Sequence, residues 1–395
     1  MDEIRTLRQD ELDDSITLSC YAFQYDVTPE EREDRKKRMN PDRIWGYFVD
    51  GKMASKMHIH DMRMYIQGKP IRMGGVASVA TWPEYRRKGM VAQLLERGLL
   101  AMKEDGQTLS CLHPFSISFY RKYGWELYTD YKTYELNATQ LPSGNAADAA
   151  GRIERADRDW RLLQGVYDRY ARRYNGTLVR DESWWNHTVF KQKGGQAAVY
   201  FDDSGDARGY MLYKVKNRIM DIGEMAYADE SARRGLWRFI ASHDSMCDKI
   251  KLQAPADDSL PFLLPDPRIV QSTVPYFTAR IVDFRGFVEQ YAFEPTGREE
   301  SVRIRLGDRQ APWNDGDFVL RADGAGAGSA EAAGDDAAAF APELACDIQT
   351  MTAMLMGYKR PRFMRDVGRL SGGDDAVERL ERIVPARATY FPDYF

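Results

Sequence analysis

The stretch VASVATWPEYRRKGMVAQLLE, residues 76–96, joins two secondary-structure patterns through a basic turn. Residues 76–81 alternate around small and apolar side chains, as a strand does, and the Arg-Arg-Lys-Gly run at 86–89 follows closely. A helical pattern then begins, and its apolar residues share one face: Met90, Val91, Leu94, Leu95, Leu99 and Met102. We therefore predict a strand, a turn and a helix with one buried face.

The cations and the glycine stand where this helix begins, which suggests an anion site. The first N–H groups of a helix are unpaired and lie at the positive end of its dipole. Gly89 lets a ligand approach the backbone closely, while Arg86, Arg87 and Lys88 add full charges. A pyrophosphate would fit, although neither the GxGxxG fingerprint nor the P-loop pattern is present. The alternative is a basic turn that only faces solvent.

The segments around this turn predict a mixed α/β unit over residues 1 to about 140. A helix with an apolar face comes first, and several antiparallel strands follow over 43–81. The segment TLSCLH, residues 108–113, predicts another strand. PFSISFYRKYGW, residues 114–125, predicts a helix opened by a proline and stopped by Gly124. We expect LYTDYKTYELN, residues 127–137, to close the sheet.

Later segments predict two further units. The small and polar residues 141–151 indicate a linker. A second unit extends to about residue 285 and repeats the strand, basic run and apolar helix around Arg233-Arg234-Gly235. In the third unit the low-complexity residues 322–340 predict a flexible hairpin loop. The chain ends in YFPDYF, and an apolar terminus of this kind is expected to be tucked into a pocket.

Composition excludes several classes of protein. A chain of 395 residues is too long for one ordinary core, so two or three domains are expected. The formal net charge of -4 argues against nucleic acid as a main partner, and no apolar run approaches the ~20 residues of a membrane span. The acidic N-terminus is unlike a signal peptide. Four scattered cysteines without a CxxC pair indicate the reducing cytoplasm.

Two motifs resemble those of the GNAT acetyltransferases. Residues 86–91, after the strand VASVAT, are similar to motif A, Q/R-x-x-G-x-G/A, with Val91 in place of the last small residue. The two motifs follow the family's order, with a helix and a strand between them. The segment PFSISFYRKYGWELY resembles motif B at four positions: Phe119, Tyr120, Gly124 and Trp125.

The whole chain resembles the Eis (enhanced intracellular survival) family, in which a GNAT unit and a degenerate second GNAT unit precede a sterol carrier protein-like domain. The second unit here keeps its basic run but has no counterpart of FYRKYGW. The resemblance implies an α/β (α+β) fold with domains at 1–145, 146–285 and 286–395. It also implies acetyl-CoA-dependent N-acetylation of amines, with aminoglycosides as acceptors of mycobacterial members, and a hexamer of two trimers.

The resemblance also implies roles for individual residues. Tyr120 would be the general acid, because a phenol of pKa about 10 is protonated at neutral pH. The C-terminal carboxylate of Phe395 would be the general base, although at a pKa of about 3.5 it is weak and would act through burial or a water. A backbone N–H near Val79 would meet the oxyanion. The acetyl-CoA groove would be formed by Val79, Thr81, Arg86, Arg87, Gly89 and Met90.

A polycationic acceptor would need an acidic, aromatic pocket. Phe23 and Asp26, in the segment YAFQYDVTPEE, are candidates by resemblance, and so is Asp393 beside the terminus. Tyr394 stands where the family has an acidic residue. The pocket of this chain would then be less acidic, and its preferred amines would differ.

Histidines offer an alternative base. His113 ends the strand before motif B, and histidine is the commonest base at neutral pH, although a histidine at a strand end is more often structural. His58 and His60 share one strand face, but without a third ligand nearby they predict no metal site. His187 and His243 have no evident partner in the sequence.

Three functions remain open from the sequence. The first is an N-acetyltransferase that acts on small-molecule amines of broad range. The second keeps the enzyme and changes the acceptor to a lysine of a protein or peptide. The third is a non-catalytic protein that binds acetyl-CoA, or an apolar ligand in its sterol carrier-like domain.

Overall fold

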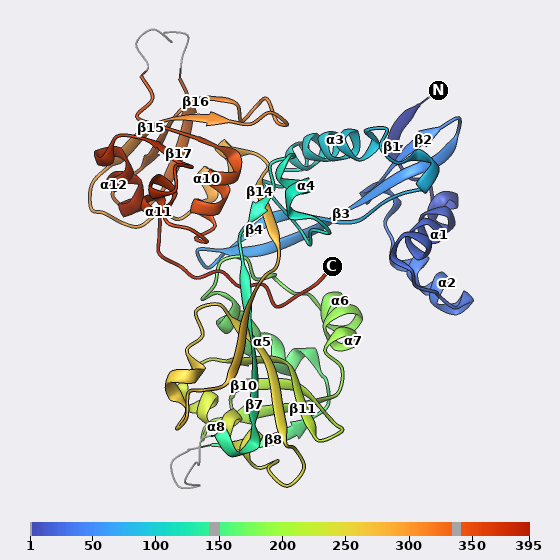
Figure 1. Ribbon diagram of the computed structural model, residues 1–395, viewed down its shortest axis with the longest axis vertical. Helices are drawn as coiled ribbons and strands as arrows, with labels where there is room; N and C mark the ends of the chain where they lie inside the picture. The colour runs from blue at the N-terminus through green and yellow to red at the C-terminus, as the bar shows by residue number, and fades with distance from the viewer. Residues whose placement is uncertain (1, 142–150, 334–340) are drawn as a thin grey trace.

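Three β-sheets organise the chain, and helices pack on their faces (Figure 1). The computed structural model describes residues 2–141, 151–333 and 341–395. All but the two ends of the predicted 141–151 linker therefore lies outside the described residues. The α/β architecture that the sequence predicts is confirmed.

The first sheet carries the basic turn. Its neighbouring strands pair antiparallel, except β4 and β5, which run parallel. Its helices are α1 (Leu12–Phe23), α2 (Pro29–Arg38), α3 (Met90–Glu104) and α4 (Ile117–Arg121). In spatial order its strands are β1 (Glu3–Thr6), β2 (Ile44–Val49), β3 (Lys52–Ile66), β4 (Lys69–Thr81), β5 (Leu109–Leu112), β14 (Thr278–Ile281) and β6 (Glu126–Leu127).

The two faces of this sheet carry different kinds of side chain, because successive residues of a strand point to opposite faces. On β3, Met57 and Ile59 pack with the apolar face of α3. Lys56, His58 and His60 have the opposite parity, so they lie on the other face, the face that α1 covers. The strand thus contributes core on one side and polar groups on the other.

The second sheet is covered on both faces. Helix α5 packs on one face and α8 on the other. Its helical elements are α5 (Trp160–Ala171), α6 (Glu182–Trp184), a π-helical turn (Trp185–Val189), α7 (Phe190–Gln192) and α8 (Glu230–Ala241). In spatial order its strands are β13 (Val270–Pro275), β7 (Asp130–Asn137), β12 (Lys249–Pro255), β11 (Ile219–Tyr227), β10 (Ala207–Lys216), β9 (Gln196–Phe201) and β8 (Arg152–Ala156).

The third sheet shares one core with part of the first. Met64, Ile71 and Leu109 of the first sheet belong to the same buried cluster as the third sheet's Ile304 and Leu320. Its helices are α9 (Phe284–Gln290), α10 (Ile348–Leu355), α11 (Pro361–Asp366) and α12 (Asp374–Ile383). In spatial order its strands are β17 (Gly328–Ala332), β16 (Gly316–Ala322), β15 (Glu300–Gly307), β18 (Leu344–Asp347) and β19 (Ser371–Gly372).

The first two sheets exchange strands, which corrects one prediction. Residues 127–137 do not close the first sheet: only β6 pairs there, and β7 joins the second sheet between β12 and β13. In return, β14 enters the first sheet between β5 and β6. Periodicity identifies a strand but not its partner, so a strand that crosses between units cannot be recognised from its own sequence.

The low-complexity segment also differs from its prediction. Residues 328–332 form β17, which pairs with β16 through a tight turn in which Asp323 accepts hydrogen bonds from Ala325 and Ala327. The rest of the predicted loop, from residue 334 to 340, lies outside the described residues.

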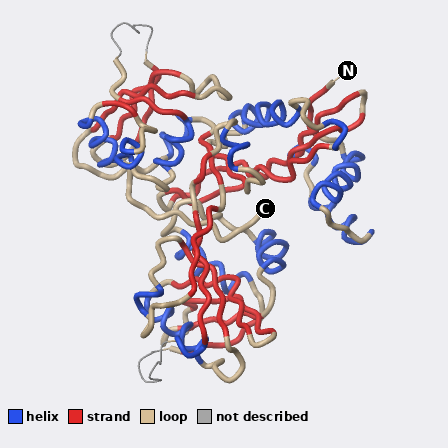
Figure 2. The backbone as a smooth tube through the Cα atoms, viewed as in Figure 1, coloured by secondary structure: helices blue, strands red, loops and turns tan. Residues whose placement is uncertain are grey.

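The C-terminal segment ends between the units. After α12 it continues as loop and reaches the junction of the first and second sheets (Figure 2). Phe391 is fully buried, and Tyr390 and Asp393 are nearly so. The prediction that an apolar terminus is tucked into the protein is confirmed for residues 390–393, whereas Tyr394 is 47% exposed.

Candidate active site

A β-bulge on β4 lies at the centre of the site. Lys56 pairs with Ala80 and His58 with Ala77, so one β3 residue opposes both Ser78 and Val79. Ser78 adopts a φ of 51°, in the left-handed region that few residues other than glycine occupy. Because of the extra residue, Val79 packs with the α3 cluster that also holds Val76.

Strands β4 and β5 separate beside this bulge. Their parallel pairing covers only three positions and ends at Gly75 opposite Cys111. Among the described residues, no strand pairs with the 76–81 segment of β4 on its β5 side. Backbone groups of this half-strand are therefore free to bond a ligand that enters between the strands. The sequence could not show this opening, because it depends on the angle between two strands.

The basic turn leaves the N-terminus of α3 open. Gly89 is the N-cap residue with a φ of 78°, no side chain caps the first N–H groups, and nothing lies within 4 Å of a Cβ placed on it. Arg86, Arg87 and Lys88 are exposed around it, and Arg87 itself has a φ of 64°. Free N–H groups and cations at a helix start attract an anion.

The corresponding turn of the second unit is closed. Asp229 caps α8 by accepting a hydrogen bond from the N–H of Ala232 at 2.9 Å. Arg233 and Arg234 form ion pairs with Glu230, and Gly235 lies inside the helix against Tyr200. Two carboxylates at this helix start repel a phosphate. The similarity of the two basic runs in sequence does not extend to their chemistry.

Tyr120 lies in the same buried cluster as Val79. It is 3% exposed on α4, with the rings of Phe115 at 5.5 Å and Phe119 at 5.2 Å between centroids. Burial raises the pKa of its phenol above the usual 10. The hydroxyl therefore holds its proton at every pH at which the protein would work.

Residues of the second unit anchor the C-terminal segment. The buried guanidinium of Arg180 pairs with Asp393 at 3.0 Å and with Glu224 at 2.7 Å. The indole N–H of Trp184 also donates to Asp393 at 3.0 Å. Lys193 donates to the carbonyl of residue 392 at 2.6 Å. Burial alone would raise the pKa of Glu224, but Arg180 and Lys193 outweigh it and lower that pKa.

These contacts place Phe395 where β4 and β5 separate. A Cβ built on Gly75 would lie 2.9 Å from the Phe395 ring, so the ring lies directly on this glycine. The ring also contacts His60 at 5.9 Å, Trp184 at 6.3 Å and Phe277 at 5.2 Å between centroids. The terminal residue thus reaches the opening next to the bulge, 320 positions from Gly75 in the sequence.

His113 lies at the end of β5 and faces the same terminus. Its ring is 5.0 Å from that of Tyr394 and 5.5 Å from that of Phe277. Burial lowers the pKa of His113, so the imidazole is neutral and able to accept a proton at neutral pH. His113 and the terminal carboxylate therefore stay as two candidate bases.

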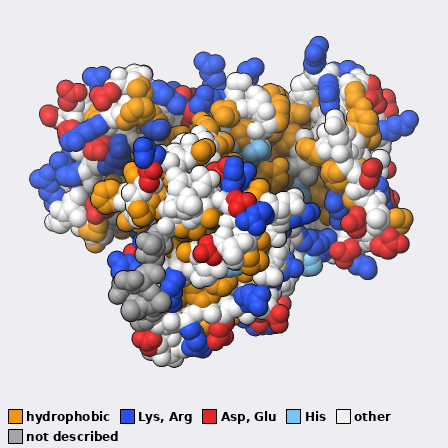
Figure 3. Space-filling view, turned by 60° about the horizontal axis from the view of Figure 1, so that its bottom comes forward, with side chains coloured by type: hydrophobic (Ala, Val, Ile, Leu, Met, Phe, Trp, Pro, Cys, Tyr) orange, Lys and Arg blue, Asp and Glu red, His pale blue; other side chains and the backbone are white. Residues whose placement is uncertain are grey.

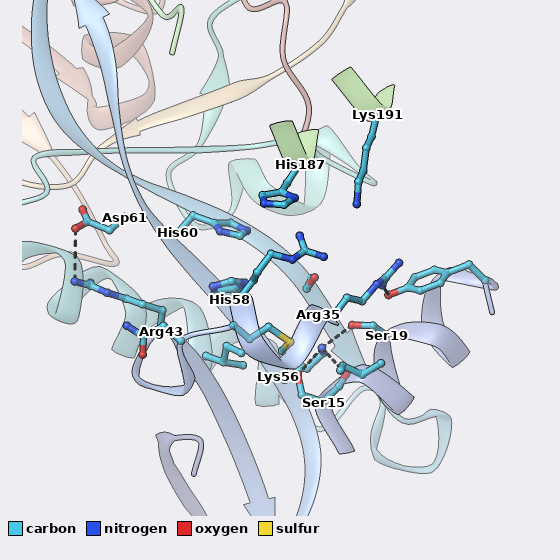
Figure 4. Close-up of a pocket in the computed structure, with 17 residues that line it drawn as sticks. Ser15, Ser19, Arg35, Arg43, Lys56, His58, His60, Asp61, His187 and Lys191 are labelled. Carbon is cyan, nitrogen blue, oxygen red and sulfur yellow. Dashed lines mark hydrogen bonds and ion pairs between the residues drawn. The ribbon is translucent and has the colours of Figure 1, made fainter. Parts of the chain in front are cut away.

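A cavity of about 680 Å³ opens beside the bulge, between the first and second units (Figure 4). Ser78 and the pair His58 and His60, whose rings are 3.8 Å apart, line its inner end. Burial lowers the pKa of His60 to about 4, so its ring is neutral. His187 enters from the π-helical turn of the second unit and lies over His60 (Figure 4).

The predicted acceptor-binding residues come from two segments, the end of α1 with the loop after it and the C-terminal segment. Phe23 is 50% exposed at the end of α1, and Asp26 is exposed in the loop that follows. Neither lines this cavity. Asp393 is 2% exposed and is engaged by Arg180 and Trp184. The structure thus gives Asp393 a role in holding the terminal segment.

Comparisons with known proteins agree with this arrangement. Models of an acetyltransferase (GNAT) domain match residues 3–128 and 176–281, and a sterol carrier protein domain model matches residues 284–392. An uncharacterized N-acetyltransferase of Streptomyces griseus is 24% identical over 431 aligned positions, covering 100% of this chain and 99% of the relative. N-acetyltransferase Eis of Mycobacterium tuberculosis is 24% identical over 348 positions, covering 84% and 82%.

A solved structure extends the likeness to the whole fold. A probable N-acyltransferase of Enterococcus faecalis has a TM-score of 0.91 at 26% identity and covers 100% of both chains. The chain is an Eis-like GNAT acetyltransferase. It is therefore an enzyme of the acyltransferase class.

Several groups of this Eis-like site escaped sequence reasoning. His58 and His60 were expected on one strand face, but the sequence offered no reason to place His187 with them. Arg180 was missed because its partners Asp393 and Glu224 are remote in sequence. The φ of Ser78 could not be foreseen either.

Two absences complete the description of the Eis-like chain. Within residues 2–141, 151–333 and 341–395, no group of three or more histidine, cysteine, aspartate or glutamate side chains is arranged to hold a metal ion. In the same described ranges, no helix combines the length and the apolar character that crossing a membrane requires.

Proposed function

We propose that the chain transfers an acetyl group from acetyl-CoA to a primary amine at the opening between β4 and β5. The observation that carries this proposal is the position of Phe395, whose ring lies on Gly75 where the two strands part. A terminus held there by a buried ion pair is not needed for a cofactor-binding module alone. It is the arrangement expected for a terminal carboxylate that takes part in the reaction.

In this proposal acetyl-CoA lies along the open half of β4. Its pyrophosphate would meet the N-terminus of α3 with Arg86, Arg87 and Gly89, and Met90 begins the helix that contributes the N–H groups. Its amide groups would bond the backbone of the unpaired 76–81 segment, which includes Thr81. The N–H of Val79, in the bulge, would stabilise the oxyanion.

The chemistry then follows from the groups around the thioester. The amine nitrogen attacks the carbonyl carbon after the ammonium loses a proton to the Phe395 carboxylate, with His113 as the alternative base. The carbon–sulfur bond breaks, Tyr120 gives its proton to the leaving thiolate, and the second proton that the attacking nitrogen loses restores the Tyr120 phenol. The products are the N-acetyl amine and CoA. Burial of Tyr120 keeps the required proton on the phenol until the thiolate forms.

The class of acceptor remains a prediction. Polycationic amines such as aminoglycosides follow from the likeness to Eis, and a lysine in a peptide is the alternative. Phe23 and Asp26 do not line the cavity beside the bulge and Asp393 is paired with Arg180, so an acceptor pocket formed by these residues stays a prediction. Assembly as a hexamer also remains a prediction.

The test is thiol release from acetyl-CoA with a panel of small amines and a lysine peptide. Three proteins are compared: the intact chain, a variant without Phe395, and a variant with Gly-Ser added after Phe395. The same dipeptide added at the N-terminus is the matched control. We expect both C-terminal changes to lower kcat about 100-fold or more while acetyl-CoA still binds in calorimetry. Full activity in both variants would remove the terminal carboxylate from the mechanism.

A further inference from the structure

The cavity beside the bulge is cationic, which is the opposite of the pocket expected for a polycation. One acidic side chain, Asp61, is among the residues that line it, against five lysines and arginines: Arg35, Arg38, Arg43, Lys56 and Lys191. The three histidines of the cavity add no negative charge. A polycationic acceptor would therefore meet like charges here, which is unfavourable.

Most of these charges have partners within the protein. Asp61 is shared by Arg72 at 3.1 Å and Arg43 at 3.7 Å. Arg38 pairs with Asp34 at 3.1 Å along α2. Besides the buried Lys56, these pairs leave two cations to account for.

Arg35 and Lys191 are those two. Arg35 donates to the hydroxyl of Tyr25 at 2.9 Å, and its guanidinium lies 4.9 Å from the centre of that ring, so it is held without being neutralised. In the part of the chain that the structure describes, neither Arg35 nor Lys191 forms an ion pair with a carboxylate. Lys191 is exposed on α7. Two cations that face one cavity attract an anion.

Their positions relate this charge to the reaction. Arg35 projects from α2 of the first unit, whereas Lys191 projects from α7 of the second, and both point into the cavity (Figure 4). Ser78 and His60 also line the cavity, and the His60 ring contacts the ring of Phe395. A molecule in the cavity would thus have its amine at the bulge and its far end between the two cations.

The floor of the cavity holds Lys56, whose pKa burial lowers to about 7, so this side chain carries only a partial charge at neutral pH. Lys56 is 2% exposed, and its ammonium donates to Ser15 and Ser19, with its nitrogen 2.6 to 2.8 Å from their oxygens. In the space-filling view of one face of the molecule, lysine and arginine side chains are interspersed with aspartate and glutamate (Figure 3).

Acetyl-CoA does not account for these cations. The basic turn at 86–89 is not part of the cavity lining, and α1 covers the sheet face opposite to α3. The phosphates of acetyl-CoA would be held at the α3 side. The cavity on the α1 side is thus left to the acceptor.

We propose that the acceptor is a small amine that also carries an anionic group, a phosphate or a carboxylate, which Arg35 and Lys191 bind between the two units. The inference rests on the N-acetyl transfer proposed above and names the acceptor class. It further assigns the second unit a direct contribution to acceptor binding.

Matched amines test the charge of the acceptor. Ethanolamine is compared with O-phosphoethanolamine, and hexylamine with 6-aminohexanoate, so that each pair differs by one anionic group and the two pairs separate phosphate from carboxylate. Kanamycin represents the polycations. Each amine is measured by thiol release and, with CoA present, by calorimetry. We expect the anionic member of at least one pair to have a kcat/KM about tenfold higher.

Variants of two α2 residues locate the effect. Arg35→Gln and Lys37→Gln each remove one charge from the same helix, but Lys37 is exposed and does not line the cavity. We expect Arg35→Gln to lower the anionic-to-neutral ratio of kcat/KM about tenfold, with Lys191→Gln acting likewise and Lys37→Gln leaving the ratio unchanged.

The readouts separate the two proposals. Preference for kanamycin and the neutral amines, with equal ratios in all variants, would overturn the anionic acceptor while leaving the acetyltransferase in place. Binding of an anionic amine that depends on Arg35, without transfer to any amine, would support the cavity's ligand class and count against the proposed reaction. If no anionic amine binds in a way that depends on Arg35, the inference of an anionic acceptor is overturned, whether or not acetyl transfer is observed.

Discussion

Gly75→Ala moves the terminal residue without altering any group assigned to the chemistry. Gly75 is the last β4 residue paired with β5, and no left-handed φ is recorded for it, so alanine is compatible with its backbone. The added methyl would meet the Phe395 ring at 2.9 and 3.1 Å and the sulfur of Met62 at 2.9 Å. The Met62 side chain is flexible and can move aside. The ring has less freedom because it is packed against other aromatic rings.

The size of the effect follows from these distances. Carbon atoms in contact are ordinarily about 3.5–4.0 Å apart. The ring would therefore shift by roughly 0.6–1 Å, and the terminal carboxylate would move with it. A displacement of about 1 Å from the productive geometry can cost about 100-fold in rate. We expect Gly75→Ala to lower kcat by this factor, with a much smaller change in the affinity for acetyl-CoA.

Steady-state kinetics with one amine and a thermal melt of each variant check this expectation. Gly74→Ala is the matched control, because its methyl would instead meet the sulfur of Met102 in the α3 core. It should lower the melting temperature and spare kcat. In a double-mutant cycle, Phe395→Leu should recover part of the activity that Gly75→Ala loses. A wild-type kcat in folded Gly75→Ala would refute the role of the terminal carboxylate.

Three further outcomes are expected. Tyr120→Phe should lower kcat about 100-fold or more. Because burial raises the pKa of Tyr120, ionisation of this phenol should cause no loss of wild-type rate at pH values up to 10, as a pH–rate profile will show. Arg87→Gln should raise the KM for acetyl-CoA about tenfold with little change in kcat, and a salt titration should shrink this difference. Lys56→Met should remove a pH dependence of stability. Burial lowers the pKa of Lys56 from 10.5 to about 7, so the unfolded chain binds more protons between these values and wild-type stability rises with pH. Denaturant unfolding should show this contribution as a rise of about 2 kcal/mol between pH 7 and 9 that the variant lacks.

Local features of the fold were predictable from the sequence. Gly89 and the apolar spacing after it predicted the start of α3, which begins at Met90 as expected. Pro114 and Gly124 likewise enclosed the segment that contains α4. Such features depend on backbone conformation and on one buried face, and both are recorded in neighbouring residues.

Features that depend on remote partners were not predictable. Arg180 and Asp393 are 213 positions apart, and neither residue shows by its type that it will be buried with the other. The exchange of β7 and β14 is a matter of pairing, which periodicity does not encode. In the sequence, Arg35 is one of many charged residues on the polar helix α2. Only the approach of the second unit makes it part of a cavity.

The second unit is a degenerate GNAT domain, and its contacts with the terminal segment and the cavity give a reason for its presence in the chain. Its own helix start is closed by Asp229, so it offers no open anion site there, yet Arg180 and Trp184 hold the terminal segment, and Lys191 faces the cavity. Removing one partner from a buried ion pair typically costs about 3–5 kcal/mol, because the other charge is left uncompensated. Loss of Arg180 would leave Asp393 and Glu224 buried together as like charges. The terminal segment would then be displaced from the second unit, and Phe395 would no longer lie on Gly75. The second unit thus holds the terminal segment in place, and under the proposed mechanism the reaction of the first unit would depend on it.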